Sequence, residues 1–134
     1  MTDNTLKLGG FQFHLPALLA QIAEMTEDGQ ETIGFLFSLV ELRARKGADY
    51  GARVDTYRNY QIVSDLKGVP GWHAAADRLV EKAVRLGNLV GKDLRGEPIS
   101  CEAIDDTLRD IALIAAIAYA MRRRNWREGE AACR

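Results

Sequence analysis

The stretch Glu102-Ala-Ile-Asp-Asp-Thr-Leu-Arg-Asp110, followed by the eleven apolar or near-apolar residues from Ile111 to Met121, decides how this chain folds. Such a long uncharged run predicts a helix that is buried nearly all round. Glu102, Asp106 and Asp110 stand four residues apart, so they share one face of that helix. Asp110 is then expected at the edge of the core, where a carboxylate usually pairs with a cation or binds a metal.

The composition is that of an ordinary globular protein, with 134 residues, 47% of them hydrophobic, 28% charged, and a net charge of −1. We expect a single domain over residues 1–134, with residues 1–14 and 126–134 peripheral. The near-neutral charge argues against a nucleic-acid polymer as partner. The longest apolar run is about half of the ~20 residues that cross a membrane, and Met1-Thr-Asp-Asn4 is not a secretion signal. A cytoplasmic protein with no membrane partner is expected.

Hydrophobic periodicity predicts four helices, over residues 16–27, 30–45, 72–90 and 100–124. Pro16 suits the first turn of a helix, Asp28-Gly29 is expected to break the chain, and Ser100 is a candidate N-cap. Residues 52–69 are expected to form a short helix or a packed loop, and no strand is predicted. The fold class is therefore all-α, a bundle of four to five helices. The long apolar run predicts a homodimer or homotetramer built partly on residues 111–121.

A second acidic pair lies on the helix predicted over residues 72–90. Asp77, Glu81, Arg85 and Asn88 follow one another at helical spacing and form one polar stripe. Taken alone, this stripe is well explained as a solvated face with a Glu81–Arg85 pair. Acidic residues at a helix N-terminus likewise explain Glu102, but not Asp110, which lies too deep in the helix.

Taken together, the two acidic stripes predict a site for a hard divalent cation, Mg²⁺ or Mn²⁺, between facing helices. The candidate ligands are Asp77, Glu81, Glu102, Asp106 and Asp110. The two histidines, His14 and His73, lack the spacing of a zinc site. Glu41 is either a further ligand or the partner of Arg45, four residues on.

Three segments resemble the MazG-like all-α nucleoside triphosphate pyrophosphohydrolases, and more closely their nucleotide-modification-associated branch, which is often found in phage genomes. The segments are Lys46-Gly-Ala-Asp49-Tyr50-Gly51, Glu81-Lys82-Ala-Val-Arg85, and Glu102 to Asp110. The resemblance spans roughly residues 30–120. It implies a MazG-like bundle, assembled as a homo-oligomer, in the host cytoplasm if the chain is phage-encoded.

The activity that the resemblance implies is hydrolysis of a nucleoside or deoxynucleoside triphosphate to the monophosphate and pyrophosphate, in nucleotide-pool cleansing or modified-nucleotide metabolism. Glu81 and Asp110 are the candidate catalytic residues, with Mg²⁺ or Mn²⁺ as cofactor. The candidates for binding substrate include cations for the phosphates, an aromatic ring to stack on a purine, and an amide for a base edge. They are Lys46, Asp49, Tyr50, Arg58, Asn59, Lys82 and Arg85.

Two other readings of the sequence stay open. One is a non-catalytic helical interaction module, such as a phage accessory protein, in which Arg and Lys side chains neutralise the carboxylates of both stripes without a metal. The other is a helical DNA-binding protein that uses Arg43, Arg45, Lys46 and the arginines at 122–124, which the acidic balance of the chain opposes.

Overall fold

The computed structural model of the protein describes residues 3–49 and 57–127, with the backbone alone for 46–49 and 125–127. The chain divides into two compact units, residues 1–42 and 43–134. Each unit is described by itself below. The expectation of one domain over residues 1–134 stays a prediction.

The first unit begins with a β-hairpin, which corrects the expectation that the chain has no strand. Strands β1 (Thr5–Leu8) and β2 (Phe11–His14) are antiparallel, and Leu8 pairs with Phe11 across the Gly9-Gly10 turn. Gly9 has a φ of 57°, a backbone conformation that favours glycine. The fold is therefore mostly helical, as predicted, with a small two-stranded sheet in addition.

Helix α1 (Leu15–Ala23) follows β2 directly, and Pro16 lies in its first turn as predicted. Helix α2 (Glu27–Asp49) begins earlier than the sequence indicated, so the predicted break at Asp28-Gly29 is wrong. The chain instead breaks just before Thr26, whose Oγ1 accepts a hydrogen bond from the Gly29 amide at 3.3 Å. Glu27 and Asp28 then fall in the first turn of α2, where negative charge suits the helix dipole.

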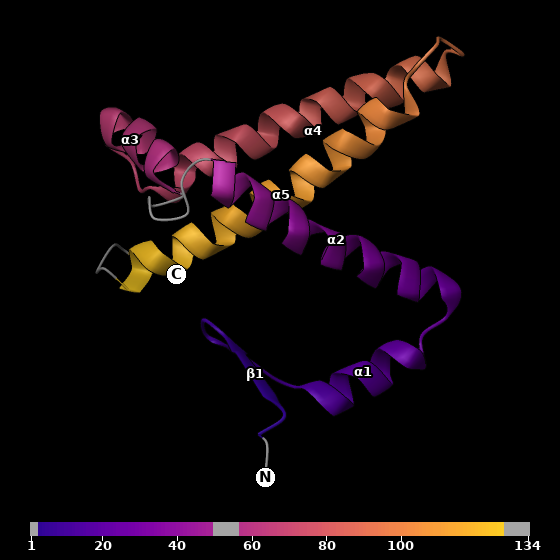
Figure 1. Cartoon of the computed structure of the whole chain (residues 1–134). Helices are drawn as coiled ribbons and strands as arrows, with labels where there is room; N and C mark the ends of the chain where they lie inside the picture. The colour runs from indigo at the N-terminus through magenta and orange to yellow at the C-terminus, as the bar shows by residue number, and fades with distance from the viewer. Residues whose placement is uncertain (1–2, 50–56, 128–134) are drawn as a thin grey trace. The chain divides into compact units, whose positions relative to one another are not determined.

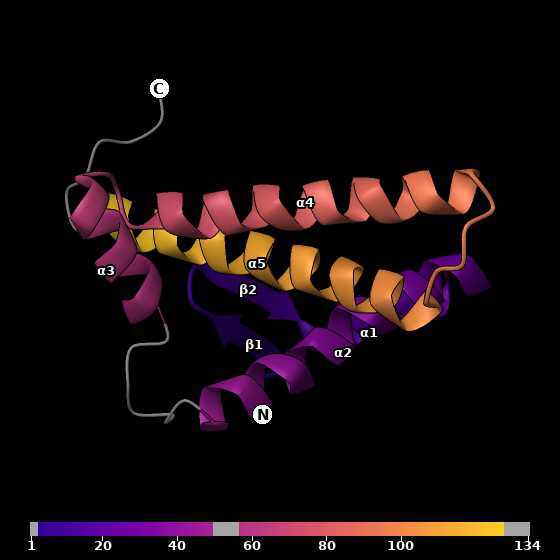
Figure 2. The same cartoon turned by 90° about the horizontal axis from the view of Figure 1, so that it is seen from above.

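The second unit contains helices α3 (Arg58–Lys67), α4 (Trp72–Leu94) and α5 (Cys101–Arg127). Helices α4 and α5 run antiparallel and side by side, as both Figure 1 and Figure 2 show, and α3 packs near the start of α4. The Ser100 hydroxyl accepts a hydrogen bond from the Ala103 amide at 3.3 Å, which confirms the predicted cap of α5. Helix α4 passes through Gly91 and ends before Gly96, which has a φ of 70°.

The contact between α4 and α5 is a seam of residues spaced alternately three and four apart. On α4 these are Ala75, Leu79, Lys82, Leu86 and Leu89, and on α5 they are Ala103, Thr107, Asp110, Ile114, Ile117 and Met121. All of them are buried or partly buried. This spacing is typical of helices that pack along a shallow left-handed crossing.

The apolar run of α5 is only partly buried, so the expected burial all round is wrong. Leu113, Ile114 and Met121 are buried, whereas Ala115, Ala116 and Tyr119 are exposed. The reason is that α4 covers one side of α5 within this unit. Small alanines on the other side make that exposure inexpensive.

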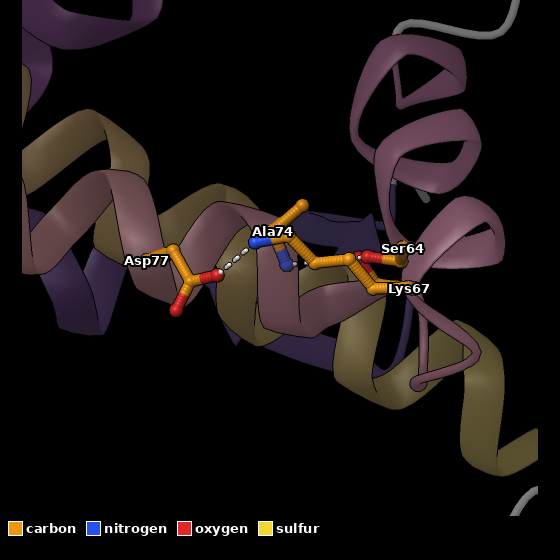
Figure 3. Close-up of polar contacts among 5 residues, drawn as sticks. Ser64, Lys67, Ala74 and Asp77 are labelled. Atoms are coloured by element: carbon orange, nitrogen blue, oxygen red, sulfur yellow. Dashed lines mark hydrogen bonds and ion pairs between the residues drawn. The ribbon is translucent and has the colours of Figure 1, made fainter.

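A buried serine joins α3 to α4 (Figure 3). Ser64 is fully buried, donates a hydrogen bond from its hydroxyl to the Gly71 carbonyl at 2.9 Å, and accepts one from the Ala74 amide at 3.2 Å. The Ala74 amide lies in the first turn of α4, where amides lack a partner within the helix. The N-cap residue of α4 is Gly71, and a side chain from α3 therefore caps an amide in the first turn of α4.

We expect Ser64→Ala to lower the free energy of unfolding by about 1–2 kcal/mol, because it leaves two buried backbone groups without their partner. The measurement is urea unfolding followed by far-UV circular dichroism. The control is Ser38→Ala, which removes an exposed hydroxyl bonded only to its own helix at Phe35. Equal stabilities of the two variants would contradict the capping role.

Candidate functional site

The centre of the candidate site is an ion pair inside the seam between α4 and α5. The Lys82 ammonium lies 2.7 Å from Asp110 Oδ2, and the two side chains are 14% and 30% exposed. Both residues occupy seam positions, with Leu79 and Leu86 next to Lys82 along α4. Asp110 thus lies at the edge of the core, as predicted from the sequence, and a cation holds it there.

This pair also sets which residues of the two helices lie at the same level. In an antiparallel pair, each step back along α5 from Asp110 matches a step forward along α4 from Lys82. Asp106 therefore lies level with the turn that holds Arg85, and Glu102 lies level with the turn around Val90. A polar pair at a seam position favours one register over the alternatives, because a shifted register would leave both charges among apolar side chains.

One side of the α4–α5 pair carries four of the predicted site residues, Glu81, Arg85, Glu102 and Asp106. Each of them comes one position before a seam residue, and in an antiparallel pair such positions on both helices face the same side. We call this side the polar face; it consists of Glu81, Arg85 and Asn88 on α4 and Glu102, Asp106 and Arg109 on α5. All six residues are exposed. Two of the three segments that resemble the pyrophosphohydrolases thus contribute to one surface.

Four of the five predicted metal ligands form ion pairs with cations. Asp110 pairs with Lys82 as described, and Asp77 Oδ2 lies 3.0 Å from Lys67 Nζ, which reaches across from α3 (Figure 3). Glu81 Oε2 lies 2.6 Å from the Arg78 guanidinium, and Asp106 Oδ1 lies 3.3 Å from that of Arg109. Glu102 is an exposed residue in the first turn of α5.

The predicted ligands do not gather as one set within a single chain. Among the residues that the structure describes, no three side chains of the His, Cys, Asp and Glu types are close enough to hold a metal ion. The register explains the spread, since Glu102 lies level with Val90, about 13 residues or ~20 Å along α4 from Asp77. Glu81 and Asp106 are closer, but Arg85 lies between their levels. The metal ligands stay a prediction.

The predicted substrate-binding residues fall into three groups. Lys46, Asp49 and Tyr50 lie outside the residues whose side chains the structure describes. Arg58 and Asn59 are exposed in the first turn of α3, and no predicted ligand lies on that helix. Arg85 lies on the polar face, whereas Lys82 lies in the seam and contacts Asp110.

An aromatic residue next to Arg58 joins two arginines that the sequence does not place together. The Arg124 guanidinium carbon lies 5.1 Å from the centre of the Tyr57 ring, and that of Arg43 lies 5.8 Å from it. Cations at such distances are attracted to the ring face. No periodicity signals this contact, because it links residues from three separate segments.

Glu41 is exposed on α2.

The seam role of Lys82 was missed, although the sequence carries a signal for it. Ala75, Leu79, Lys82, Leu86 and Leu89 are spaced four, three, four and three residues apart, as helix-packing residues are. Lys82 interrupts an otherwise apolar series at one position, and Asp110 does the same in the matching series of α5. Opposite charges at seam positions of two neighbouring helices predict that the two charged side chains contact each other. The role of Lys67 has no such signal, since the sequence predicts either a short helix or a packed loop over residues 52–69.

We expect Asp110→Asn to lower the free energy of unfolding by about 1–3 kcal/mol, because it leaves the Lys82 ammonium in the seam without its carboxylate. The double variant Lys82→Met/Asp110→Leu should recover most of that loss, since apolar side chains suit the seam. Urea unfolding of the wild type, Lys82→Met, Asp110→Leu and the double variant gives the coupling free energy. Asp77→Asn, whose ion pair is exposed, should change stability by less than about 1 kcal/mol. A coupling near zero would mean that the seam pair contributes nothing to the fold.

Neither protein-family models, nor curated proteins, nor solved structures match this chain. None of the helices in the described part of the chain is long and apolar enough to span a membrane. Function is therefore inferred from the residues themselves and from their placement in α3, α4 and α5.

Proposed function

We propose that this protein is a (deoxy)nucleoside triphosphate pyrophosphohydrolase, which uses Mg²⁺ or Mn²⁺ and releases a nucleoside monophosphate and pyrophosphate. The observation that carries the proposal is the polar face. It brings Glu81 and Arg85, from one motif of the family resemblance, to the same side as Glu102 and Asp106, from the other motif. The Lys82–Asp110 pair holds the two helices in that register.

The exposed residues of the polar face have the chemistry that the reaction needs. A triphosphate carries about four negative charges, and a divalent cation bound with it would offset them and favour attack at phosphorus. The planar guanidinium of Arg85 suits the phosphate oxygens. An exposed carboxylate such as Glu81 can orient a water molecule and accept its proton.

The ion pairs of Glu81 and Asp106 do not prevent this use. Their side chains are 64% and 61% exposed, and each pairs with an arginine only three residues away on its own helix. Exposed pairs of this kind contribute at most about 1 kcal/mol, so a stronger cationic ligand can displace the arginine. Asp110 differs, because its partner lies in the seam and cannot swing into solvent. In this proposal Asp110 acts by holding α5 against α4.

A second candidate function is a non-catalytic helical interaction module, and one observation favours it. Asp77, Glu81, Asp106 and Asp110 are each neutralised by a Lys or Arg side chain. A non-catalytic module requires its carboxylates to be neutralised in this way. Thermal denaturation separates the two candidates, since a nucleotide with Mg²⁺ should raise the melting temperature of the enzyme and leave that of the module unchanged.

The test of the enzyme is a panel of nucleoside and deoxynucleoside triphosphates incubated with Mn²⁺ or Mg²⁺. We expect pyrophosphate, rather than orthophosphate, to be released. Glu81→Gln and Asp106→Asn should each lower kcat/KM by at least about 100-fold, because each removes a charge from the reacting face without changing the size of the side chain.

The matched control is Asp93→Asn, the same change on an exposed residue in the last turn of α4. It should keep the wild-type rate. Release of orthophosphate, or full activity in both Glu81→Gln and Asp106→Asn, would refute the proposed reaction. No turnover and no thermal shift with any nucleotide would favour the interaction module.

A further inference from the structure

The β-hairpin and helix α1 are joined without a connecting loop. Strand β2 ends at His14, and α1 begins at Leu15. His14 therefore has two structural roles, because it pairs with Thr5 in the hairpin and is also the N-cap residue of α1. Its φ of −84° and ψ of 105° are extended, as is usual for the residue that precedes a helix.

The amides at the start of α1 are satisfied from outside the helix. The Leu15 amide donates a hydrogen bond to the Asn4 carbonyl at 2.8 Å, and Pro16 has no amide hydrogen to satisfy. The Ala17 amide donates to Nδ1 of the His14 ring at 3.4 Å. The side-chain cap of α1 is thus an imidazole, where serine, threonine, asparagine or aspartate is usual.

This capping bond requires the neutral form of His14. In a neutral imidazole one ring nitrogen donates a hydrogen bond and the other accepts one, whereas in the cation both nitrogens donate. Nδ1 accepts the bond from Ala17, so the ring hydrogen of the neutral form lies on Nε2. Protonation of Nδ1 would turn two N–H groups toward each other and break the bond.

The start of α1 also lacks a charge that would favour the cation. A positive charge at a helix N-terminus is opposed by the helix dipole, and a nearby carboxylate can offset it. Helix α2 carries Glu27 and Asp28 in its first turn, whereas α1 has no acidic residue there. The whole of α1, Leu15–Ala23, contains no charged residue.

The charged groups of the hairpin do not offset the charge either. Lys7 shares one face of the hairpin with His14, since residues alternate between the two faces and Thr5 pairs with His14. Asp3 Oδ1 accepts a hydrogen bond from the Thr5 amide at 3.1 Å. In the part of the chain that the structure describes, no ion pair joins Asp3 to His14.

We propose that His14 makes the junction between β2 and α1 a pH-sensitive joint. The neutral imidazole caps α1, and the protonated imidazole releases the Ala17 amide. Imidazoles change charge between about pH 5 and pH 8. The cap is therefore complete above that range and is lost as the pH falls through it.

A short helix depends strongly on its ends. Helix α1 has nine residues, and helices of that length are marginal by themselves in water. The bond from the Leu15 amide to the Asn4 carbonyl contains no group that titrates in this range, so it persists at lower pH. Protonation should accordingly loosen the first turn of α1 and leave the hairpin paired.

The joint and the candidate site belong to different parts of the chain. His14 and its partners lie within the first unit, whereas the polar face lies on α4 and α5. The proposed joint therefore does not involve hydrolase chemistry, and its test contains no nucleotide or metal ion.

Nuclear magnetic resonance of the labelled full-length chain at pH 8 and pH 5.5 tests the joint. The ¹³Cα shifts of residues 15–18 report the helical population of the first turn of α1. We expect the ratio of helical to open conformations there to fall about 5-fold at the lower pH, the size expected for loss of a side-chain cap. Most carboxylates stay ionised at pH 5.5, so the shifts of the first turn of α2 should not change in the same way.

Two variants identify the group that titrates. His14→Asn replaces the imidazole with a good capping residue that does not titrate, so α1 should stay equally helical at both pH values. His73→Gln is the matched control, because His73 is the other of the two histidines in the chain. It should keep the 5-fold response of the wild type.

Loss of the response in His14→Asn, with its retention in His73→Gln, supports the joint. A wild-type α1 that is equally helical at pH 8 and pH 5.5 would overturn it. The same pH response in His14→Asn as in the wild type would place the titrating group elsewhere and also overturn it. A first turn that is already open at pH 8 in His14→Asn would refute the capping role itself, since asparagine is a strong N-cap.

Discussion

The Lys82–Asp110 ion pair is the constraint on which the arrangement of the second unit depends. It lies among the apolar residues of the α4–α5 seam, with both side chains at most 30% exposed. Such a pair adds little net stability over apolar residues of similar size, but breaking it by removing one partner is costly. Its effect is to select the register, because any shift of α5 along α4 would separate the two charges. That register determines which residues of α4 lie at the same level as which residues of α5.

The register in turn divides the helix pair into two surfaces of opposite character. Residues that precede the seam are mainly charged or amide side chains, including Glu81 and Asp106. Those that follow it are uncharged, including Val90 and Leu108, except for Arg122 after the last seam residue of α5. A helix with one apolar stripe needs one partner, whereas α4 has a seam and a further apolar side. The sequence of α4 is thus suited to two contacts, and α5 of the same chain provides only one of them.

The parts of the fold that could be predicted from the sequence are those with a local physical cause. Pro16 has a backbone preset for a first helical turn, and Ser100 offers a hydroxyl to the amides of α5. The β-hairpin was missed because strands of four residues hold too little alternation to signal a strand. The predicted break at Asp28-Gly29 is wrong because this dipeptide, which is common in turns, here lies in the first turn of α2, where the Thr26 hydroxyl accepts a hydrogen bond from the Gly29 amide.

The candidate site was predictable in its residues but not in their contacts. Spacing alone predicted that Glu102, Asp106 and Asp110 share one face of a helix. In α5 the first two do lie together on the polar face. Asp110, at the same spacing, lies in the seam instead, because a helix has 3.6 residues per turn and a stripe of every fourth residue drifts around it. Cations three residues away on the same helix, such as Arg109 for Asp106, were not foreseen as partners.

The difference between these ion pairs decides what each carboxylate can do. An exposed pair such as Arg78–Glu81 competes with water on both sides, so its partners exchange readily for another ion. The pair in the seam has no such freedom, because the Lys82 ammonium would have to give up its carboxylate while still largely shielded from water. A divalent cation that binds this chain should therefore recruit the carboxylates of the polar face and leave Asp110 with its lysine. Burial therefore distinguishes acidic residues that are equally spaced along α5. The exposed ones can bind a cation, whereas the one in the seam, Asp110, holds the two helices together.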